Sequence, residues 1–208
     1  MARPKKIKNE VLIQAAREIF LERGFSVPTS EIAKHAGVSE GTLFKRFETK
    51  ERLFREAMRP SSEDLGWLDA LLLHAGRGDL KDHLMVAARE GIHFFRRMMP
   101  LFVMASSHPS VRNIQEQLMS GPQPPPILAT RRLVSFFEME MKLGRLRESD
   151  PRILSRVFMA TLSQYVFFET LVQAPAAFHI PLDEYVEGVV ELILCGGLPS
   201  EHITSQDS

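Results

Sequence analysis

Apolar residues recur at spacings of three and four along most of the chain, and this periodicity constrains the fold more than any other feature. Near the start of the chain the repeating residues are Ile7, Val11, Leu12, Ala15, Ala16, Ile19 and Phe20. This spacing places them on one face of an amphipathic helix. No segment alternates apolar and polar residues between turn signals, as a half-buried strand would. The sequence therefore predicts an all-α protein without a sheet.

Four short helices are predicted within the first sixty residues, because helix stop and start signals follow one another closely there. Gly24 is placed to end the first helix, and Ser39 is a good N-cap for the third. Pro28 suits the first position of the second helix, and Pro60 limits the fourth. The expected ranges are 7–23, about 28–36, 39–47 and 49–59.

Beyond Pro60 the helical pattern continues, with interruptions that contain glycine or proline. They are expected at 76–78, Pro100, 108–109, 121–126, 144–151 and 174–181. The last two helices are expected over about 151–173 and 181–195. We therefore predict a head over residues 1–48, a helical body over residues 49–199 and a disordered polar tail over residues 200–208.

Charge is divided unevenly along the chain, although its 26 Lys and Arg residues balance its 26 Asp and Glu residues. Residues 1–59 hold 13 basic and 8 acidic side chains, a net charge of +5, which leaves −5 for the remainder. A basic segment joined to an acidic body suggests that the front of the chain faces nucleic acid. The leader carries Arg3, Lys5 and Lys6. It is either a solvated tail or an arm that contacts phosphates or the minor groove.

The second and third predicted helices have the form of a helix-turn-helix, whose second helix enters the DNA major groove. They are joined by residues 37–39, and a small core of Ile32, Ala33, Val38 and Leu43 is expected between them. The remaining side chains are short hydrogen-bonding groups and two cations, which suit base edges and phosphates. This exposed set comprises Thr29, Ser30, Glu40, Gly41, Thr42, Lys45 and Arg46.

The stretch EIAKHAGVSEGTLFKRFETKERLF, residues 31–54, resembles the TetR family of bacterial transcriptional regulators almost position by position. The preceding AAREIF, residues 15–20, together with Gly24 and Phe25, resembles the first helix of that family. The resemblance covers roughly residues 7–58. It implies a three-helix DNA-binding head, a helical body with an effector pocket, and a homodimer formed through the last two helices.

The resemblance also implies roles for individual side chains of the head. Those expected nearest the bases are Glu40, Gly41 and Thr42, and those expected at the DNA backbone are Thr29, Ser30 and Lys50. Lys45 and Arg46 would contact phosphates or bases.

Two positions depart from the family pattern. Phe44 stands where the family usually has a tyrosine whose hydroxyl meets a phosphate. Phenylalanine cannot make that hydrogen bond, which leaves an apolar contact such as one with a thymine methyl group. The connection from Gly24 to Ile32 is also one residue shorter than usual, which could shift the cap of the second helix.

The body is rich in phenylalanine and methionine, with nine of the fourteen Phe and eight of the ten Met residues lying beyond Pro60. These side chains are either core or the lining of an adaptable apolar cavity. Because the resembling family holds an effector in this region, we expect an apolar small-molecule effector. The residues expected to bind it are Phe94, Phe95, Met98, Phe102, Phe136, Phe137, Met141, Phe158, Tyr165 and Phe168.

The last two predicted helices have apolar residues around too wide an arc for one contact within the chain. The additional contact is expected to be a second copy, in agreement with the resemblance. The residues expected at this dimer interface are Tyr165, Val166, Val172, Val186, Val189, Val190 and Ile193. A two-fold dimer would present two reading helices to an inverted-repeat operator in double-stranded DNA.

Other classes of protein find little support in the residues. The seven histidines show no zinc-ligand spacing, and no phosphate loop or nucleophile motif is present, so neither an enzyme, a metal site nor a cofactor is expected. Cys195 is expected to be an inert core thiol rather than a redox sensor. The chain shows neither a signal peptide nor a membrane span, so no membrane partner and a cytoplasmic location are expected.

The sequence thus predicts a ligand-responsive transcriptional regulator, more readily a repressor than an activator. In this hypothesis an apolar effector favours a conformation with the heads displaced, and the fourth helix transmits the change. The alternative is a constitutive or structural DNA-binding dimer that has no small-molecule effector.

Overall fold

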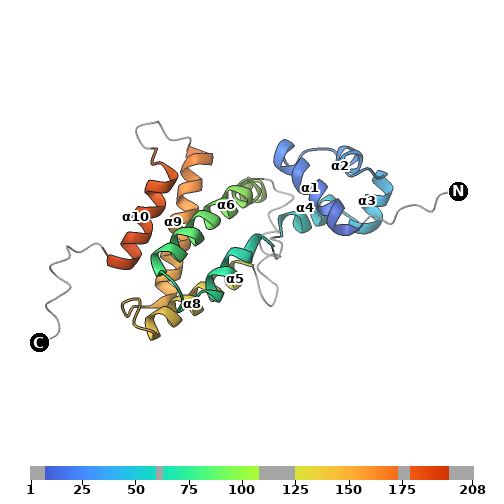
Figure 1. Ribbon diagram of the computed structural model, residues 1–208. Coiled ribbons are helices and arrows are strands. Elements are labelled where there is room, and N and C mark those ends of the chain that lie inside the picture. Colours follow the sequence, from blue (N-terminus) through green and yellow to red (C-terminus); the bar gives the residue numbers. More distant parts are fainter. Residues whose placement is uncertain (1–7, 60–62, 108–124, 173–178, 197–208) are drawn as a thin grey trace, which may run out of the picture. The chain divides into compact units, whose positions relative to one another are not determined.

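The computed structural model describes residues 8–59, 63–107, 125–172 and 179–196, and within these ranges it contains helices and no strand. The all-α prediction is confirmed for this part of the chain (Figure 1). The described residues form two compact units. One holds residues 8–59, 98–107 and 125, and the other holds residues 63–97, 126–172 and 179–196.

The first unit begins with four helices: α1 Asn9–Arg23, α2 Thr29–His35, α3 Glu40–Phe47 and α4 Lys50–Met58. Helix α1 packs against α2 and α4, and α3 packs against both α2 and α4. Their shared core is apolar and includes Leu12, Ala16, Phe20, Ile32, Ala33, Leu43, Phe47, Leu53, Phe54 and Ala57. The expected contact between the second and third helices therefore forms, with Val38 half-buried at its edge.

The helix ends follow from local capping groups. The Ser39 side chain accepts a hydrogen bond from the Thr42 backbone N–H at 3.2 Å, and the Thr49 side chain accepts one from Arg52 at 3.0 Å. Gly24 ends α1 with a positive φ of 76°, a conformation that glycine adopts without steric cost. Pro28 occupies the N-cap position of α2, one residue before the place expected for it.

A tight turn separates α3 from α4. The Thr49 N–H donates to the Phe47 carbonyl at 2.6 Å, which encloses Glu48 in a γ-turn with φ 62° and ψ −51°. This conformation is rare for a residue with a Cβ and costs roughly 1–3 kcal/mol. The two capped helices on either side hold it, so the direction of α4 relative to α3 is fixed within three residues.

The second unit is built from helical segments that surround an apolar interior. These are η1 Glu63–Leu65, α5 Gly66–Leu73, α6 Leu80–Ser107, α8 Pro125–Lys142, α9 Pro151–Phe167, the π-helical turn η3 Phe168–Val172 and α10 Leu182–Cys195. Helix α6 contributes to both units. The predicted breaks at 76–78 and 144–151 are confirmed, whereas residues 108–109 and 121–124 lie outside the described residues, as do 174–178 and the tail.

One predicted break is wrong, because α6 continues through Pro100. A proline inside a helix removes one backbone hydrogen bond and costs about 3 kcal/mol. Helix α6 extends over 28 residues, and Leu84, Ala88 and Ile92 on it are completely buried. The free energy gained by burying this face offsets the loss of the hydrogen bond. The position of a proline in the sequence does not reveal this burial, so the sequence predicted a break.

A buried carboxylate fixes two of the connections in the second unit. Glu140 on α8 is completely buried and accepts a hydrogen bond from the Gly76 backbone N–H at 2.7 Å. Its other oxygen lies 2.8 Å from Nε of Arg145. Arg145 also donates to the carbonyl of Gly78 at 3.0 Å. The α5–α6 and α8–α9 connections are therefore joined to each other.

Candidate nucleic-acid interface

Helix α3 has one buried side and one polar side. Leu43 and Phe47 are buried in the head, and Ser39 caps the helix at its start. The other side exposes Glu40, Gly41, Phe44 and Lys45 and half-exposes Thr42 and Arg46. Apart from its chain neighbours and the backbone of α3, no atom of the described residues lies within 4 Å of the place where a Cβ on Gly41 would stand. Six residues that the sequence assigned to DNA therefore share one accessible face, with its cations in the last turn.

The first turn of α3 is joined to the start of α2. The Thr29 hydroxyl donates a hydrogen bond to the Glu40 carboxylate. Ser30, next to Thr29, is exposed. This contact brings together two residues for which the sequence predicted different partners, the DNA backbone for Thr29 and the bases for Glu40.

The last turn of α3 is joined to the start of α1. Nη1 of Arg46 donates to Oδ1 of Asn9 at 2.9 Å, so the guanidinium of Arg46 is held at the end of the polar side of α3. Sequence reasoning missed Asn9, because the two residues are 37 positions apart and nothing local connects them. Asn9 is exposed, as is Lys45 beside Arg46.

Lys50, at the start of α4, is half-buried and has a defined position. Its Nζ lies 4.7 Å from the centre of the Phe25 ring, a cation–π contact. Phe25 in turn meets Phe54 edge to face, with 5.0 Å between ring centres. Burial lowers the pKa of Lys50, and the neighbouring Glu51 carboxylate acts in the opposite direction. A cation fixed on an aromatic ring loses little conformational entropy when it meets a phosphate.

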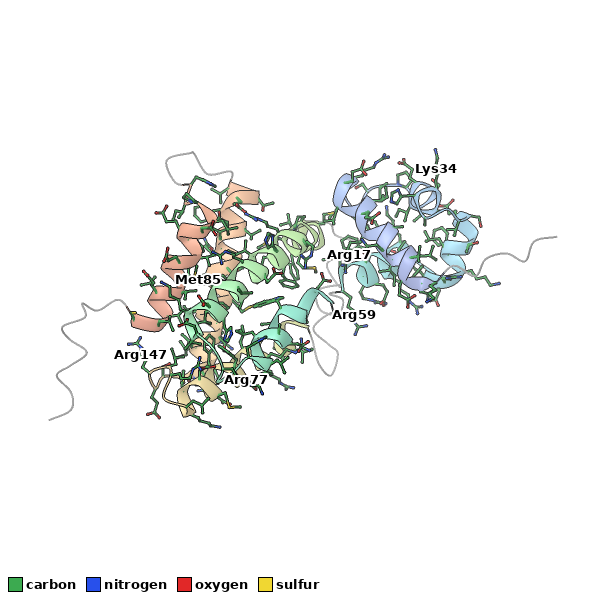
Figure 2. All side chains as sticks on the ribbon, viewed as in Figure 1. Arg17, Lys34, Arg59, Arg77, Met85 and Arg147 are labelled. Atoms are coloured by element: carbon green, nitrogen blue, oxygen red, sulfur yellow. The ribbon has the colours of Figure 1, made fainter. Side chains whose placement is uncertain are left out.

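Two further residues tie α1 to its neighbours. Arg17 donates from Nε to the Ala57 carbonyl at 2.7 Å and from Nη2 to the Arg59 carbonyl at 2.6 Å. Figure 2 labels Arg17 and Arg59 at this junction. His35 on α2 lies 2.9 Å from the Glu18 carboxylate, and this hydrogen bond lowers the pKa of Glu18. The predicted arm residues Arg3, Lys5 and Lys6 lie outside the described residues.

Comparison with known proteins places this head in a family. Residues 12–57 match the bacterial regulatory proteins of the tetR family. The TetR-family transcriptional regulator PfmR from Thermus thermophilus has the same fold, with a TM-score of 0.58 and 20% sequence identity over 91% of this chain and 99% of that one. Residues 12–57 therefore form an N-terminal domain of the TetR family.

Two other structures of similar fold contain ligands. FadR from Bacillus subtilis, in complex with stearoyl-CoA, matches with a TM-score of 0.63 and 20% identity over 91% of this chain and 99% of that one. AibR, in complex with isovaleryl coenzyme A and operator DNA, matches with a TM-score of 0.53 and 13% identity over 89% of this chain and 97% of that one. At these identities the likeness concerns the fold.

By burial, the ten predicted effector residues fall into three groups. Phe95 and Met141 are half-buried, Phe102 and Phe168 are exposed, and the other six are buried. Phe137 meets Phe136 and Phe158 edge to face, with 5.4 and 6.2 Å between ring centres. These three therefore form one aromatic cluster between α8 and α9. The buried six are Phe94, Met98, Phe136, Phe137, Phe158 and Tyr165.

Among the buried polar atoms of the second unit that have no hydrogen-bond partner in the described residues are two N–H donors. They are Nε1 of Trp67 on α5 and Nη1 of Arg132 on α8. The six-membered ring of Trp67 packs beside Gly91 of α6, where an added Cβ would lie 3.2 Å from it. Nε of Arg132 is held 3.0 Å from Asp69. An unpaired buried donor costs about 1–3 kcal/mol, so each of these atoms is a place where a bound acceptor would be favoured.

The predicted dimer residues are distributed differently. Val166, Val186 and Val190 are completely buried within one chain, and Tyr165, Val189 and Ile193 are nearly so. Only Val172 is exposed among the seven. Other apolar side chains of α9 and α10 are accessible instead. They include Ile153, which is 63% exposed, Leu192, which is 61% exposed, and Val157.

These accessible side chains border a groove between α9 and α10, which we call the α9–α10 groove. Its volume is about 380 Å³. It is lined by Leu146, Arg147, Ser149, Asp150, Ile153, Leu154, Val157, Thr161, Val189, Leu192 and Ile193. Two of the predicted dimer residues, Val189 and Ile193, lie at its base, whereas none of the predicted effector residues lines it.

The prediction that Cys195 is a core thiol is wrong. Cys195 is exposed at the last position of α10, not buried in a core. The reason is its place on the helix: Cys195 follows Leu192 by three residues on the exposed side, whereas Val190 and Ile193 face inward.

No group of three or more His, Cys, Asp or Glu side chains among the described residues could hold a metal ion. No described helix is both long and apolar enough to cross a membrane.

Proposed function

We propose that this protein is a TetR-family transcriptional regulator that binds an inverted-repeat operator as a homodimer and leaves it when an effector occupies the body. The observation that carries the proposal is the polar side of α3, whose opposite side is sealed in the head by Leu43 and Phe47. A helix anchored in this way can enter the major groove without exposing the core. The predicted division after residue 48 and the sign of control, repression, are parts of this proposal.

The proposed DNA contacts divide into two kinds. Arg46 and Lys50 are held by Asn9 and Phe25 and would meet phosphates. Gly41 and Thr42 lie in the first turn of α3, which approaches base edges in helix-turn-helix proteins. Phe44 is 39% exposed and would make the apolar contact predicted for it.

The proposed dimer uses the outer side of α9 and α10. A second copy would cover Ile153, Val157 and Leu192 and fill the α9–α10 groove. Burying apolar surface contributes about 25 cal/mol per Å², so exposed side chains of this size favour association. Val189 and Ile193, at the base of the groove, would then lie at the interface as predicted.

The proposed effector combines an apolar chain with a hydrogen-bond acceptor. The aromatic cluster of Phe136, Phe137 and Phe158 supplies apolar surroundings, and Trp67 and Arg132 supply buried donors. The similar structures of FadR and AibR hold coenzyme A esters of carboxylic acids. An acyl-coenzyme A ester, which has an apolar chain and a carbonyl oxygen, fits both requirements.

Selection of bound fragments from a random DNA pool with the purified protein tests the central claim. Recovery of an inverted repeat is expected, and recovery of no common sequence would overturn the proposal. The effector is tested by adding stearoyl-CoA and isovaleryl-CoA separately to the complex with the selected DNA. Release of DNA together with a higher melting temperature is expected from at least one of them. If no apolar ester has either effect, the constitutive DNA-binding dimer is favoured.

A further inference from the structure

The Glu40 carboxylate occupies an unusual place for a group that approaches DNA. It is the first residue of α3, it is exposed, and it accepts a hydrogen bond from the Thr29 hydroxyl of α2. The start of a helix stabilises a negative charge such as that of a carboxylate. DNA binding therefore brings an anion to the surface of a polyanion.

Chemistry limits what this carboxylate can contact on DNA. An ionised carboxylate only accepts hydrogen bonds, and so does a phosphate, so the two repel each other. The donors in the major groove are the amino groups of cytosine and adenine. On adenine the amino group lies beside the N7 acceptor, which would face the second carboxylate oxygen. Cytosine has no acceptor of its own beside its amino group, so it is the better partner.

Thr29 determines where the carboxylate points. A hydroxyl has one hydrogen, and Thr29 donates it to Glu40. That hydrogen is then not available to a phosphate, which would also need it. Ser30 is exposed next to Thr29 and can still make the backbone contact predicted for this pair.

We propose that Glu40 reads the amino group of a cytosine in each operator half-site and that Thr29 is the positioning residue that aims its carboxylate. This inference rests on the proposed binding to an operator, and it adds the identity of one base. In this proposal Thr29 positions Glu40 and does not make the contact with a phosphate that the sequence predicted for it.

The test is a set of random-DNA selections with the full chain and five variants. The wild-type protein is expected to select a cytosine at one position of each half-site. With Glu40→Ala, which removes the acceptor, the preference there should fall by about tenfold. With Glu40→Gln, it should move from cytosine toward adenine, because glutamine pairs with N6 and N7 of adenine. Both variants should bind random DNA more tightly, since a charge that repels phosphates is gone.

Thr29→Val removes the donor while it keeps the shape of the side chain, and Thr29→Ser keeps the donor. Thr29→Val should weaken the cytosine preference at the same position, and Thr29→Ser should retain it. Ser30→Ala is the matched control for a phosphate contact and should lower affinity for all sequences without changing any base preference. Melting temperatures of all variants show that the head is folded.

The outcomes separate this inference from the proposed function. If the wild-type protein selects no inverted repeat, the proposed function fails. If it selects one and Glu40→Ala gives the same base preferences at every position, the role of Glu40 is overturned while operator binding stands. If Thr29→Val leaves the cytosine preference at its wild-type value, the positioning role of Thr29 is overturned.

Discussion

Nε of Arg17 on α1 lies 2.7 Å from the carbonyl oxygen of Ala57 on α4, and the same guanidinium reaches the carbonyl of Arg59. The last carbonyls of a helix have no partner within it and carry partial negative charge. The Arg17 guanidinium donates hydrogen bonds to these carbonyls, and its positive charge offsets their partial negative charge. Because α1 also packs against α2 and α4, a displacement of the end of α4 would carry the whole head with it.

Replacing Arg17 tests this coupling. Arg17→Ala should destabilise the protein by about 1–3 kcal/mol, because two charge-assisted hydrogen bonds are lost at a site partly screened by water. It should also reduce the amount of DNA released at a saturating effector concentration, since α4 is no longer fastened to α1. Urea unfolding and the DNA-release titration measure the two effects. Lys34→Ala removes an exposed cation of the same unit and is the control. An equal loss of stability and of DNA release in both variants would argue against the coupling of α1 to α4 through Arg17.

The salt dependence of binding distinguishes phosphate contacts from base contacts. Lys50→Ala and Arg46→Ala should each weaken binding to all sequences and reduce the slope of log K against log[salt] by about one. Thr42→Ala should instead relax the discrimination between operators. Equilibrium titrations at four salt concentrations, with the selected operator and a random duplex, give these quantities. An unchanged slope for Lys50→Ala would show that Lys50 does not meet a phosphate.

The proposed dimer can be broken by placing a charge in the α9–α10 groove. Val157→Glu or Leu192→Glu should convert the protein to a monomer at micromolar concentration, because an unpaired carboxylate would be buried at the interface. Operator affinity should fall with it, since the two heads would no longer bind together. Val86→Glu is the matched control, because Val86 is equally exposed on α6 but does not line the groove. Sedimentation velocity that shows a wild-type monomer would refute the dimer.

The single tryptophan of the chain provides a direct reporter of the proposed effector contact. Stearoyl-CoA is expected to change the fluorescence of Trp67, because an acceptor would reach its buried N–H. Trp67→Phe keeps an aromatic ring beside Gly91 but removes the donor, so it should weaken binding about fivefold, the value of one ordinary hydrogen bond. Affinity is measured by the shift in melting temperature. Undiminished affinity in Trp67→Phe would exclude the N–H as a ligand contact.

The helix ends of the head are determined by local contacts, whereas several contacts between its helices join residues far apart in the sequence. Ser39, Thr49 and Gly24 define helix ends through contacts within four residues, so the bounds of α1, α3 and α4 follow from the sequence to within about two residues. The contacts of Arg46 with Asn9 and of Arg17 with Ala57 join residues about forty positions apart, and no local pattern announces them.

The sequence also does not determine which apolar residues lie in the core and which lie on the surface. Val190 and Leu192 have the same character in the sequence, yet one is completely buried and the other exposed. Their burial depends on which side of α10 meets α9, and that is decided by packing among whole helices. For the same reason the residues that the sequence predicts at a dimer interface are mainly ones that lie on the inner sides of α9 and α10.

The start of α9 should make stability sensitive to acid. Asp150 caps this helix by accepting a hydrogen bond from the Arg152 backbone N–H at 2.8 Å. Hydrogen bonds from the Arg152 side chain do most to lower the pKa of Asp150 from 3.8 to about 2. A carboxyl with a depressed pKa in the folded state stabilises the protein fully above pH 3.8, and this contribution is lost as the pH falls toward 2. Asp150→Asn should therefore have a lower urea midpoint of unfolding than the wild type at pH 5. The difference between the two midpoints should become smaller as the pH falls from 4 to 2. Glu138→Gln, which changes an exposed carboxylate on α8, is the control, and a gap for Asp150→Asn that is constant across this range would contradict the assignment.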